Sequence, residues 1–370
     1  MNVEKFIAKI NRSISEKVHL SFLKWALGVH RKASNIGVWG ESGRYPLIYQ
    51  SIRLTLNYYK RVSAADDNTF IKAALKEQKL LKLPWFKNIE PLLKLDEIFH
   101  MDHVTAYRTI KNKNVISNSP RGSTSIIKPL PSQKFRVQNI IKTLTEHFIA
   151  CWKHEKSVSP KLSFYNNCKG KFARESYLDV TKGFSRRYST SKFRISSHDL
   201  EIEQGRYTNT PRELRVCAWC QLSIGVNVLE DENHLLYDCD LYSGLRSKLI
   251  TNLNNAPQHQ NNAYPQLHVD VHSLKSNFAK LLSPFSHPNP DSVALNSFNI
   301  HHKIQNLQST ANAPEHLESH KRRSYIINCM CTYLYRAMEK RRKYINNLRE
   351  LESKRNTLVI YFNNSIPNSH

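Results

Sequence analysis

Four residues of the types that bind metal ions lie within one stretch of 23 residues, and no other feature restricts the possible folds as strongly. Cys217 and Cys220 are separated by two residues, His234 follows after thirteen more, and Cys239 after another four. Zinc in proteins is held by four thiolate or imidazole ligands in a tetrahedral arrangement. A two-residue gap lets one tight turn direct two thiolates at a single ion. We expect these four residues to bind Zn²⁺.

A site with four protein ligands leaves no open position for water or substrate, so we expect the zinc to be structural. The alternative interpretation is three buried, reduced cysteines beside an unrelated histidine. The acidic run Glu230, Asp231 and Glu232 precedes His234. It could orient the imidazole, or it could be a solvated helix N-terminus, where acidic side chains are favourable. We favour the solvated helix N-terminus.

The charge balance of the chain favours a polyanion as partner. Its 370 residues include 55 Lys plus Arg against 30 Asp plus Glu, a formal net charge of +25. Such an excess fits nucleic acid or an anionic membrane. No stretch of the sequence has the ~20 apolar residues of a membrane span, and the first residues lack the apolar run of a signal peptide. We therefore expect an intracellular protein, in nucleus or cytoplasm, that binds RNA or single-stranded DNA and neither a membrane nor a small-molecule substrate.

The patterns of apolar residues predict a mainly α-helical fold with a small zinc module and disordered linkers. In the first helical region, Phe22, Leu23, Ala26 and Leu27 form an apolar stripe. The predicted organisation is a helical region at 1–112, a linker at 113–134, a helix with a basic aromatic segment at 135–200, a zinc module at 201–255, a disordered linker at 256–315, a long charged helix at 316–353 and a tail at 354–370.

The basic aromatic segment is a candidate surface for nucleic acid. Residues 121–200 carry a net charge of +11, whereas residues 201–255 carry −3. Aromatic rings that stack on bases, beside cations that follow the phosphates, can hold a single strand. Equally, the aromatic side chains could form a core and the cations a solvated face. The candidate nucleic-acid-binding residues are Lys169, Lys171, Arg174, Arg186 and Arg187, with Arg206 in the neighbouring module. A protein partner could also bind the helix at 324–348.

Two separate stretches of the sequence resemble one known family. The first is Phe22-Leu-Lys-Trp25-Ala-Leu-Gly28-Val, followed by Gly43-Arg44-Tyr45-Pro46-Leu47. The second runs from Glu203-Gln-Gly205-Arg206-Tyr207 through the Cys and His residues to Leu245-Arg246. In this order they resemble the region after the reverse transcriptase domain of LINE-type non-LTR retrotransposon polyproteins, over about residues 20–250. One departure is Asp240, where the family commonly has Pro. The resemblance implies a zinc-containing module that binds nucleic acid and supports target-primed reverse transcription.

No catalytic centre is predicted in the chain itself. Polymerases use paired carboxylates to hold two divalent ions, but Ala65-Asp66-Asp67 follows a predicted helix, so we interpret it as a turn or N-cap. His100 and His103 are interpreted as helix-end residues, and Cys329 and Cys331 as core-filling residues. The chain is expected to be inert alone. The alternative is that it belongs to an RNA-directed DNA polymerase whose catalytic domain lies upstream.

Overall fold

The computed structural model describes residues 14–87, 89–90, 93, 133–257, 269–272, 274–275 and 314–365, with backbone alone at 133–136, 314–320 and 357–365. Within these ranges the regular elements are helices, and one antiparallel bridge pairs Val216 with Leu229. The mainly helical fold predicted from the sequence is confirmed. The chain divides into two compact units: Met1–His19 with Tyr45–His154, and Leu20–Arg44 with Glu155–His370.

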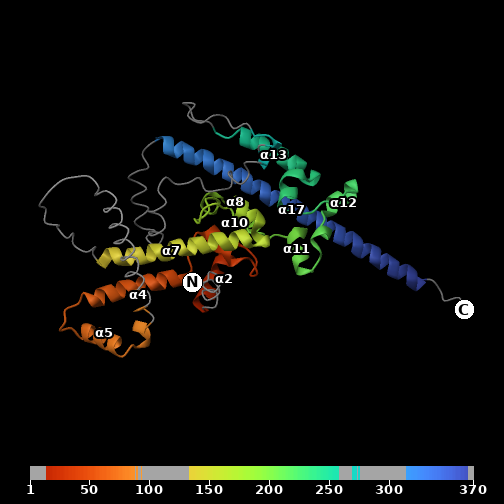
Figure 1. Ribbon diagram of the computed structural model, residues 1–370. Helices are drawn as coiled ribbons and strands as arrows, with labels where there is room; N and C mark the ends of the chain where they lie inside the picture. Colours follow the sequence, from red (N-terminus) through yellow and green to blue (C-terminus); the bar gives the residue numbers. More distant parts are fainter. Residues whose placement is uncertain are drawn as a thin grey trace, which may run out of the picture. The chain divides into compact units, whose positions relative to one another are not determined.

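The first unit contains α4 (Leu47–Ser63), α5 (Phe70–Leu80) and most of α7 (Gln133–Val158) (Figure 1). Its small core consists of Leu56, Ile89, Ile140 and Ile141. The ring of Phe148 from α7 packs edge-on against Tyr49, with ring centroids 5.5 Å apart. Tyr49 and Leu56 recur at helical spacing along α4, and Ile140, Ile141 and Phe148 do so along α7. Each helix therefore buries one face.

The second unit is organised around α17 (Pro314–Ser365), the long blue helix of Figure 1, which contacts α9, α10 and α13. The other elements of this unit are the last part of α2 (Ile14–Leu27), α3 (Asn35–Ser42), η1 (Pro160–Leu162), α8 (Ser163–Cys168), α9 (Tyr177–Val180), α10 (Phe184–Arg194), α11 (Glu201–Tyr207), η2 (Arg212–Leu214), α12 (Ala218–Ile224), η3 (His234–Asp238), η4 (Asp240–Tyr242) and α13 (Ser243–Asn254).

The helix α17 extends beyond the bounds predicted for it. It begins at Pro314 and ends at Ser365, so most of the segment predicted to be a loose tail is helical. Past Lys354 the residues are mostly weaker helix formers, such as Asn, Thr, Val and Ile. The helix continues there because propagating an existing helix costs much less than starting one. Six apolar residues recur at helical spacing in this sequence, which predicts a single apolar stripe. All six are buried, namely Ile326, Ile327, Met330, Leu334, Ala337 and Met338.

A single hydrophobic core includes residues from both sides of position 200, where the charge changes sign. Phe164 and Phe193 precede that position, and Leu235, Leu249 and Met330 follow it. The module boundary predicted near residue 200 is therefore not a boundary between packed bodies. Charge describes the solvated surface, and a core can continue beneath a surface whose charge changes sign.

The segment predicted as a disordered linker at 256–315 contributes to this core where it is described. Val269 and Leu274 are buried. The side chain of Asn254 donates to the carbonyl oxygen of Val269 at 3.0 Å and accepts from its N–H at 2.7 Å. This pairing returns the chain to the end of α13. The rest of 256–315 and the linker predicted at 113–134 lie almost wholly outside the described residues.

The short helix α3 is buried along almost its whole length. Val38 and Trp39 are fully buried. The helix ends at Gly43, whose φ of +61° is left-handed, and a Cβ there would lie 2.2 Å from the backbone nitrogen of Arg174. Only glycine meets both conditions without strain.

Four charged side chains form a buried cluster that links α3 to α10. The Nε of Arg194 donates to both carboxylate oxygens of Glu41, at 3.0 and 3.1 Å. Its Nη2 lies 3.0 Å from Glu175, which also pairs with Lys169 at 2.5 Å. Burial raises the pKa of Glu175, and the two nearby cations counteract that effect. Such charges are tolerated in a core because each has a partner.

The apolar stripe predicted for α2 is only half correct. Leu23 and Leu27 are buried, as expected, but Phe22 is 59% exposed and Ala26 is also exposed. Phe22 contacts Trp25, which is itself exposed.

Candidate metal centre

The first two cysteines of the cluster are positioned by α12 and by the bridge beside it. Cys217 is the residue before α12, and Cys220 lies in its first turn. The N–H of Cys217 donates to the carbonyl of Val228 at 2.7 Å, next to the bridge. The helix ends at Gly225, whose φ of +69° turns the chain back toward this bridge. The hairpin-like turn therefore holds the thiols of Cys217 and Cys220 on the same side of the segment 216–229.

The other two members of the cluster lie at the two ends of a single π-helical turn. His234 opens η3, and its N–H donates to Oδ1 of Asp231 at 2.9 Å. Cys239 follows η3, and its N–H donates to the carbonyl of His234 at 2.9 Å. The wide π-type turn brings Cys239 back beside His234.

These four side chains converge on one point. The Sγ atoms of Cys217 and Cys239 are 3.9 Å apart, and those of Cys220 and Cys239 are 3.8 Å apart. Nε2 of His234 lies 3.4 Å from Sγ of Cys220. All four donor atoms lie within 4.8 Å of one another, and all four residues are buried. The sulfur distances exclude disulfide bonds, whose length is about 2.05 Å. The structure thus contains a buried Cys₃His cluster that could hold a metal ion.

The electrostatics of the cluster favour a cation. A hydrogen bond from the Cys239 thiol lowers the pKa of Cys217 to about 4, and the same bond raises the pKa of Cys239. Burial raises the pKa of Cys220 to about 11. Adjacent thiolates repel one another, so the three cannot all ionise unless a cation lies between them. A metal ion would supply that charge.

A buried arginine supports the turn that carries Cys239. Nη2 of Arg246 in α13 donates to the carbonyl of Cys239 at 2.7 Å, and Nη1 donates to Leu236 at 3.4 Å. Nδ1 of His234 is buried and makes no hydrogen bond within the described residues. Nε2, which lies 3.4 Å from Sγ of Cys220, is the nitrogen that faces the cysteines.

The acidic run before His234 has a role that neither sequence interpretation predicted. Glu230 and Glu232 are buried rather than solvated. Glu230 accepts from Nε of Arg341 at 2.8 Å and from Nη2 at 2.6 Å. Glu232 accepts from Ser196 at 2.7 Å and lies 3.0 Å from Nε2 of His198. Because these partners are far away in the sequence, no local pattern could identify them.

The proposed nucleic-acid residues differ in their placement. Lys169 is 1% exposed and paired with Glu175, so we correct its assignment to that of a structural residue. Arg174 is exposed and forms a bidentate pair with Asp179. Arg206 pairs with Glu203 and is 29% exposed. Lys171 and Arg186 are exposed, and Arg187 lies over the exposed ring of Phe184, 4.6 Å from its centroid.

The aromatic side chains of the same segment mostly belong to the core. Phe164, Tyr165, Tyr177 and Phe193 are buried. Phe184 is the clear exception, at 65% exposed. Of the two interpretations left open by the sequence, the aromatic core describes these four residues, because large rings gain most from burial.

Those residues considered for catalysis that the structure describes do not lie together. Asp66 and Asp67 are exposed in the turn before α5, where the side chain of Thr69 caps the helix. Cys331 is buried and accepts from the Thr181 hydroxyl at 3.3 Å, and Cys329 is half-buried. His100 and His103 lie outside the described residues. Among the described helices none is both long and apolar enough to cross a membrane.

Comparison with other proteins gives no family to which the chain can be assigned. No protein-family model matches it, no curated protein matches it, and no solved structure matches it. The Cys₃His cluster and the helices packed around it are therefore interpreted from their own geometry.

Proposed function

We propose that this chain is a non-catalytic, nucleic-acid-binding module of the LINE type, in which zinc holds a basic helix in place. The proposal rests on the resemblance described above and on one structural observation. The surface of α17 carries many cations, and the inner face of the same helix is anchored to the Cys₃His segment. RNA or single-stranded DNA in the nucleus or cytoplasm is the proposed partner.

Zinc is the metal that best fits the cluster. With Zn–S near 2.3 Å and Zn–N near 2.0–2.1 Å, a tetrahedral site separates two sulfurs by about 3.8 Å and a sulfur from a nitrogen by about 3.6 Å. The observed separations of 3.9, 3.8 and 3.4 Å agree with these values. Three thiolates and one imidazole are soft or borderline ligands, which disfavours Mg²⁺ and Ca²⁺. Bound zinc would fix α12 and η3 against each other.

Four contacts anchor α17 to the metal-binding segment. Arg341 pairs with Glu230, as described above. The hydroxyl of Tyr333 lies 3.2 Å from the carbonyl oxygens of both Leu235 and Leu236. The ammonium of Lys340 donates to the carbonyl of Leu241 at 2.7 Å. The rings of Trp219 and Tyr344 meet edge-on, 5.2 Å apart. The residues around the cluster thus help to position α17.

The remaining surface of α17 is strongly basic. Residues 321–356 contain eleven Lys or Arg and three Glu. Arg336, Arg342, Lys343, Arg349, Lys354 and Arg355 are exposed. Cations in a row along a rigid helix can neutralise successive phosphates and release their counterions. This surface, more than the basic aromatic segment, supports nucleic acid as the partner.

The proposal is tested by measuring affinity for a fluorescent single-stranded oligonucleotide at several salt concentrations. If about six phosphates are neutralised, log affinity falls against log salt with a slope of about −4. The triple variant Arg342→Gln, Lys343→Gln, Arg349→Gln is expected to weaken binding and to flatten that slope by about 2, because three phosphate contacts are removed.

The matched control removes three exposed cations from the first unit, in Arg61→Gln, Lys82→Gln and Lys87→Gln. It changes net charge equally and should leave the slope nearly unchanged. Equal effects of the two triple variants would show that overall charge, and not α17, attracts the strand. A protein partner whose binding survives high salt, with no affinity for the oligonucleotide, would instead favour an interaction scaffold.

A further inference from the structure

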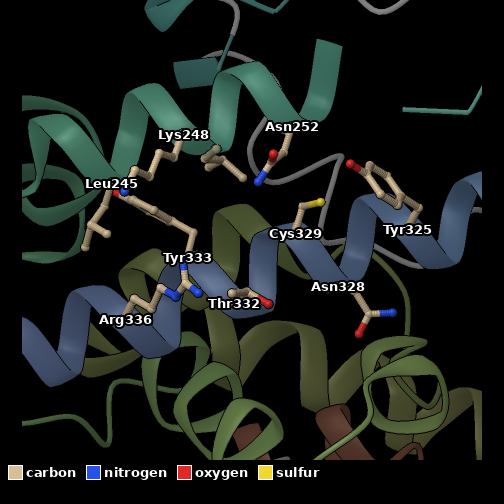
Figure 2. A pocket seen from close by; sticks show the side chains of 10 residues that line it. Leu245, Lys248, Asn252, Tyr325, Asn328, Cys329, Thr332, Tyr333 and Arg336 are labelled. Carbon is tan, nitrogen blue, oxygen red and sulfur yellow. The ribbon is translucent and has the colours of Figure 1, made fainter. Parts of the chain in front are cut away.

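A small cavity lies between α13 and α17, on the second unit and away from the Cys₃His cluster's own ligands. Its volume is about 160 Å³. Lys248 and Asn252 from α13 line it on one side, and Tyr325, Cys329 and Arg336 from α17 on the other, with Tyr333 between the helices (Figure 2).

The walls of this cavity are held in place by the fold. Leu249 and Leu253 of α13 and Met330 and Leu334 of α17 are buried in the shared core. Tyr333 is fixed by its hydroxyl, which lies against two backbone carbonyls of η3. A ligand that enters the cavity therefore meets preformed walls, which limits the loss of conformational entropy on binding.

The chemistry of the lining selects an anionic, polar ligand. Among the described residues no carboxylate lines the cavity, whereas two cations do. Lys248 and Arg336 are exposed and make no ion pair within the described residues. This contrasts with Arg194, Arg246 and Arg341, all of which are buried and bonded to protein groups. Free cations at a cavity mouth attract phosphate.

Uncharged polar and aromatic groups complete the lining. Asn252 is exposed on α13 and makes no hydrogen bond within the described part of the chain, so its amide can both donate and accept. Tyr325 is partly exposed at the same end of the cavity (Figure 2). An aromatic face beside an amide can stack on a nucleobase and bond to its edge.

The volume of the cavity further restricts the ligands that can fit. A cavity of about 150 Å³ holds a single ring such as benzene, whereas sites for whole cofactors or drug-sized ligands occupy about 300–1,000 Å³. With about 160 Å³, this cavity has room for one ring.

We propose that the cavity between α13 and α17 accepts one base of a bound single strand, while Lys248 and Arg336 contact the phosphates beside that base. This inference rests on the proposed function, because the strand must first bind α17. The cavity would add a contact to a base, whereas the contacts of α17 are with the phosphates alone.

Cys329 provides a reporter inside the cavity. It is the one cysteine of the seven that is not buried. Burial of part of its side chain raises its pKa, so alkylation is best followed at mildly alkaline pH. Cys329→Ala identifies the reacting thiol. The experiment measures the alkylation rate in the full, zinc-loaded chain, with a single-stranded DNA oligonucleotide, with its abasic counterpart, with inorganic phosphate, or with polyglutamate.

We expect the saturating oligonucleotide to slow alkylation about tenfold and the other three probes to have little effect. Lys248→Gln with Arg336→Gln should raise the concentration needed for half-protection about tenfold. Asn252→Trp, a change at an exposed position, should fill the cavity and abolish the preference for the normal over the abasic strand. Its salt slope should stay unchanged, because α17 still binds the backbone.

Several outcomes would overturn the inference. Equal protection by the abasic strand would mean that no base enters. Protection by phosphate or by polyglutamate alone would identify an anion site or an acidic-peptide site. If the oligonucleotide binds α17 with the expected salt slope but leaves Cys329 unprotected, the cavity is not used and the proposed function stands. If no oligonucleotide binds at any salt concentration, the proposed function falls as well.

Discussion

At the scale of single residues, the buried ion pairs of the second unit place charged groups where water cannot solvate them. Glu41 accepts two hydrogen bonds from Arg194 and a third, at 2.6 Å, from the Tyr177 hydroxyl. Both charged side chains are fully buried. Removing the Glu41 charge would leave two cations, Arg194 and Lys169, to share the carboxylate of Glu175. One positive charge would then be uncompensated in a medium of low dielectric constant.

Glu41→Gln is therefore expected to lower the free energy of unfolding by about 3–5 kcal/mol, measured by urea denaturation. The control is Asp179→Asn, which breaks an exposed pair with Arg174 and should change stability by less than about 1 kcal/mol. Similar losses in the two variants would contradict the role assigned to the buried cluster.

At the scale of elements, the contact between α17 and the acidic run before His234 is one of the contacts that position the basic helix. Arg341 is 5% exposed and bonds both oxygens of Glu230. Its neighbour Arg342 is exposed. The two arginines are adjacent in the sequence, yet one has a structural role and the other faces solvent.

Arg341→Met is expected to destabilise the second unit by about 3–5 kcal/mol, because the buried carboxylate of Glu230 would lose its cation and keep the N–H of Glu201 as a donor. Adding Glu230→Gln should restore part of that loss, and a double-mutant cycle measures the coupling. Arg342→Met serves as the exposed control and should leave stability nearly unchanged. Strictly additive losses from the Arg341 and Glu230 changes would show that the two residues are not coupled.

At the scale of the whole molecule, the Cys₃His cluster is part of the core that also contains α8, α10, α13 and α17. Cys217, Cys220 and Cys239 pack in the same cluster as Phe193, Leu249 and Met330. A metal at this site would thus stabilise the whole second unit and not only the segment 201–255. The first unit has its own small core.

Purified chain is expected to contain about one zinc per molecule. A strong chelator, or Cys220→Ser, should expose backbone amides of α12, α13 and α17 to hydrogen exchange while α4 and α5 stay protected. The control is Cys329→Ser, which changes a cysteine outside the cluster and should leave zinc content unchanged. Metal-free protein that keeps the protection of α17 would show that the metal does not stabilise this unit.

The sequence by itself determined the features that depend on the spacing of residues close together in the chain. The Cys and His residues at 217, 220, 234 and 239 converge as predicted. Gaps of two and four residues keep the members of each pair close, and the bridge between Val216 and Leu229 brings the two pairs together. The helical period also predicted the buried stripe of α17, since a residue's face on a helix follows from its position alone.

What only the tertiary structure decided is which charges are buried and with which partners. Lys169 and Arg194 look like the exposed cations around them, and Glu230 looks like a solvated helix start. The partner of Lys169 is Glu175, six residues away. The partner of Arg194 comes from α3, and that of Glu230 comes from α17. A charged side chain carries no local signal of its burial, because its ionic partner can lie more than a hundred residues away and is brought close only when the core forms.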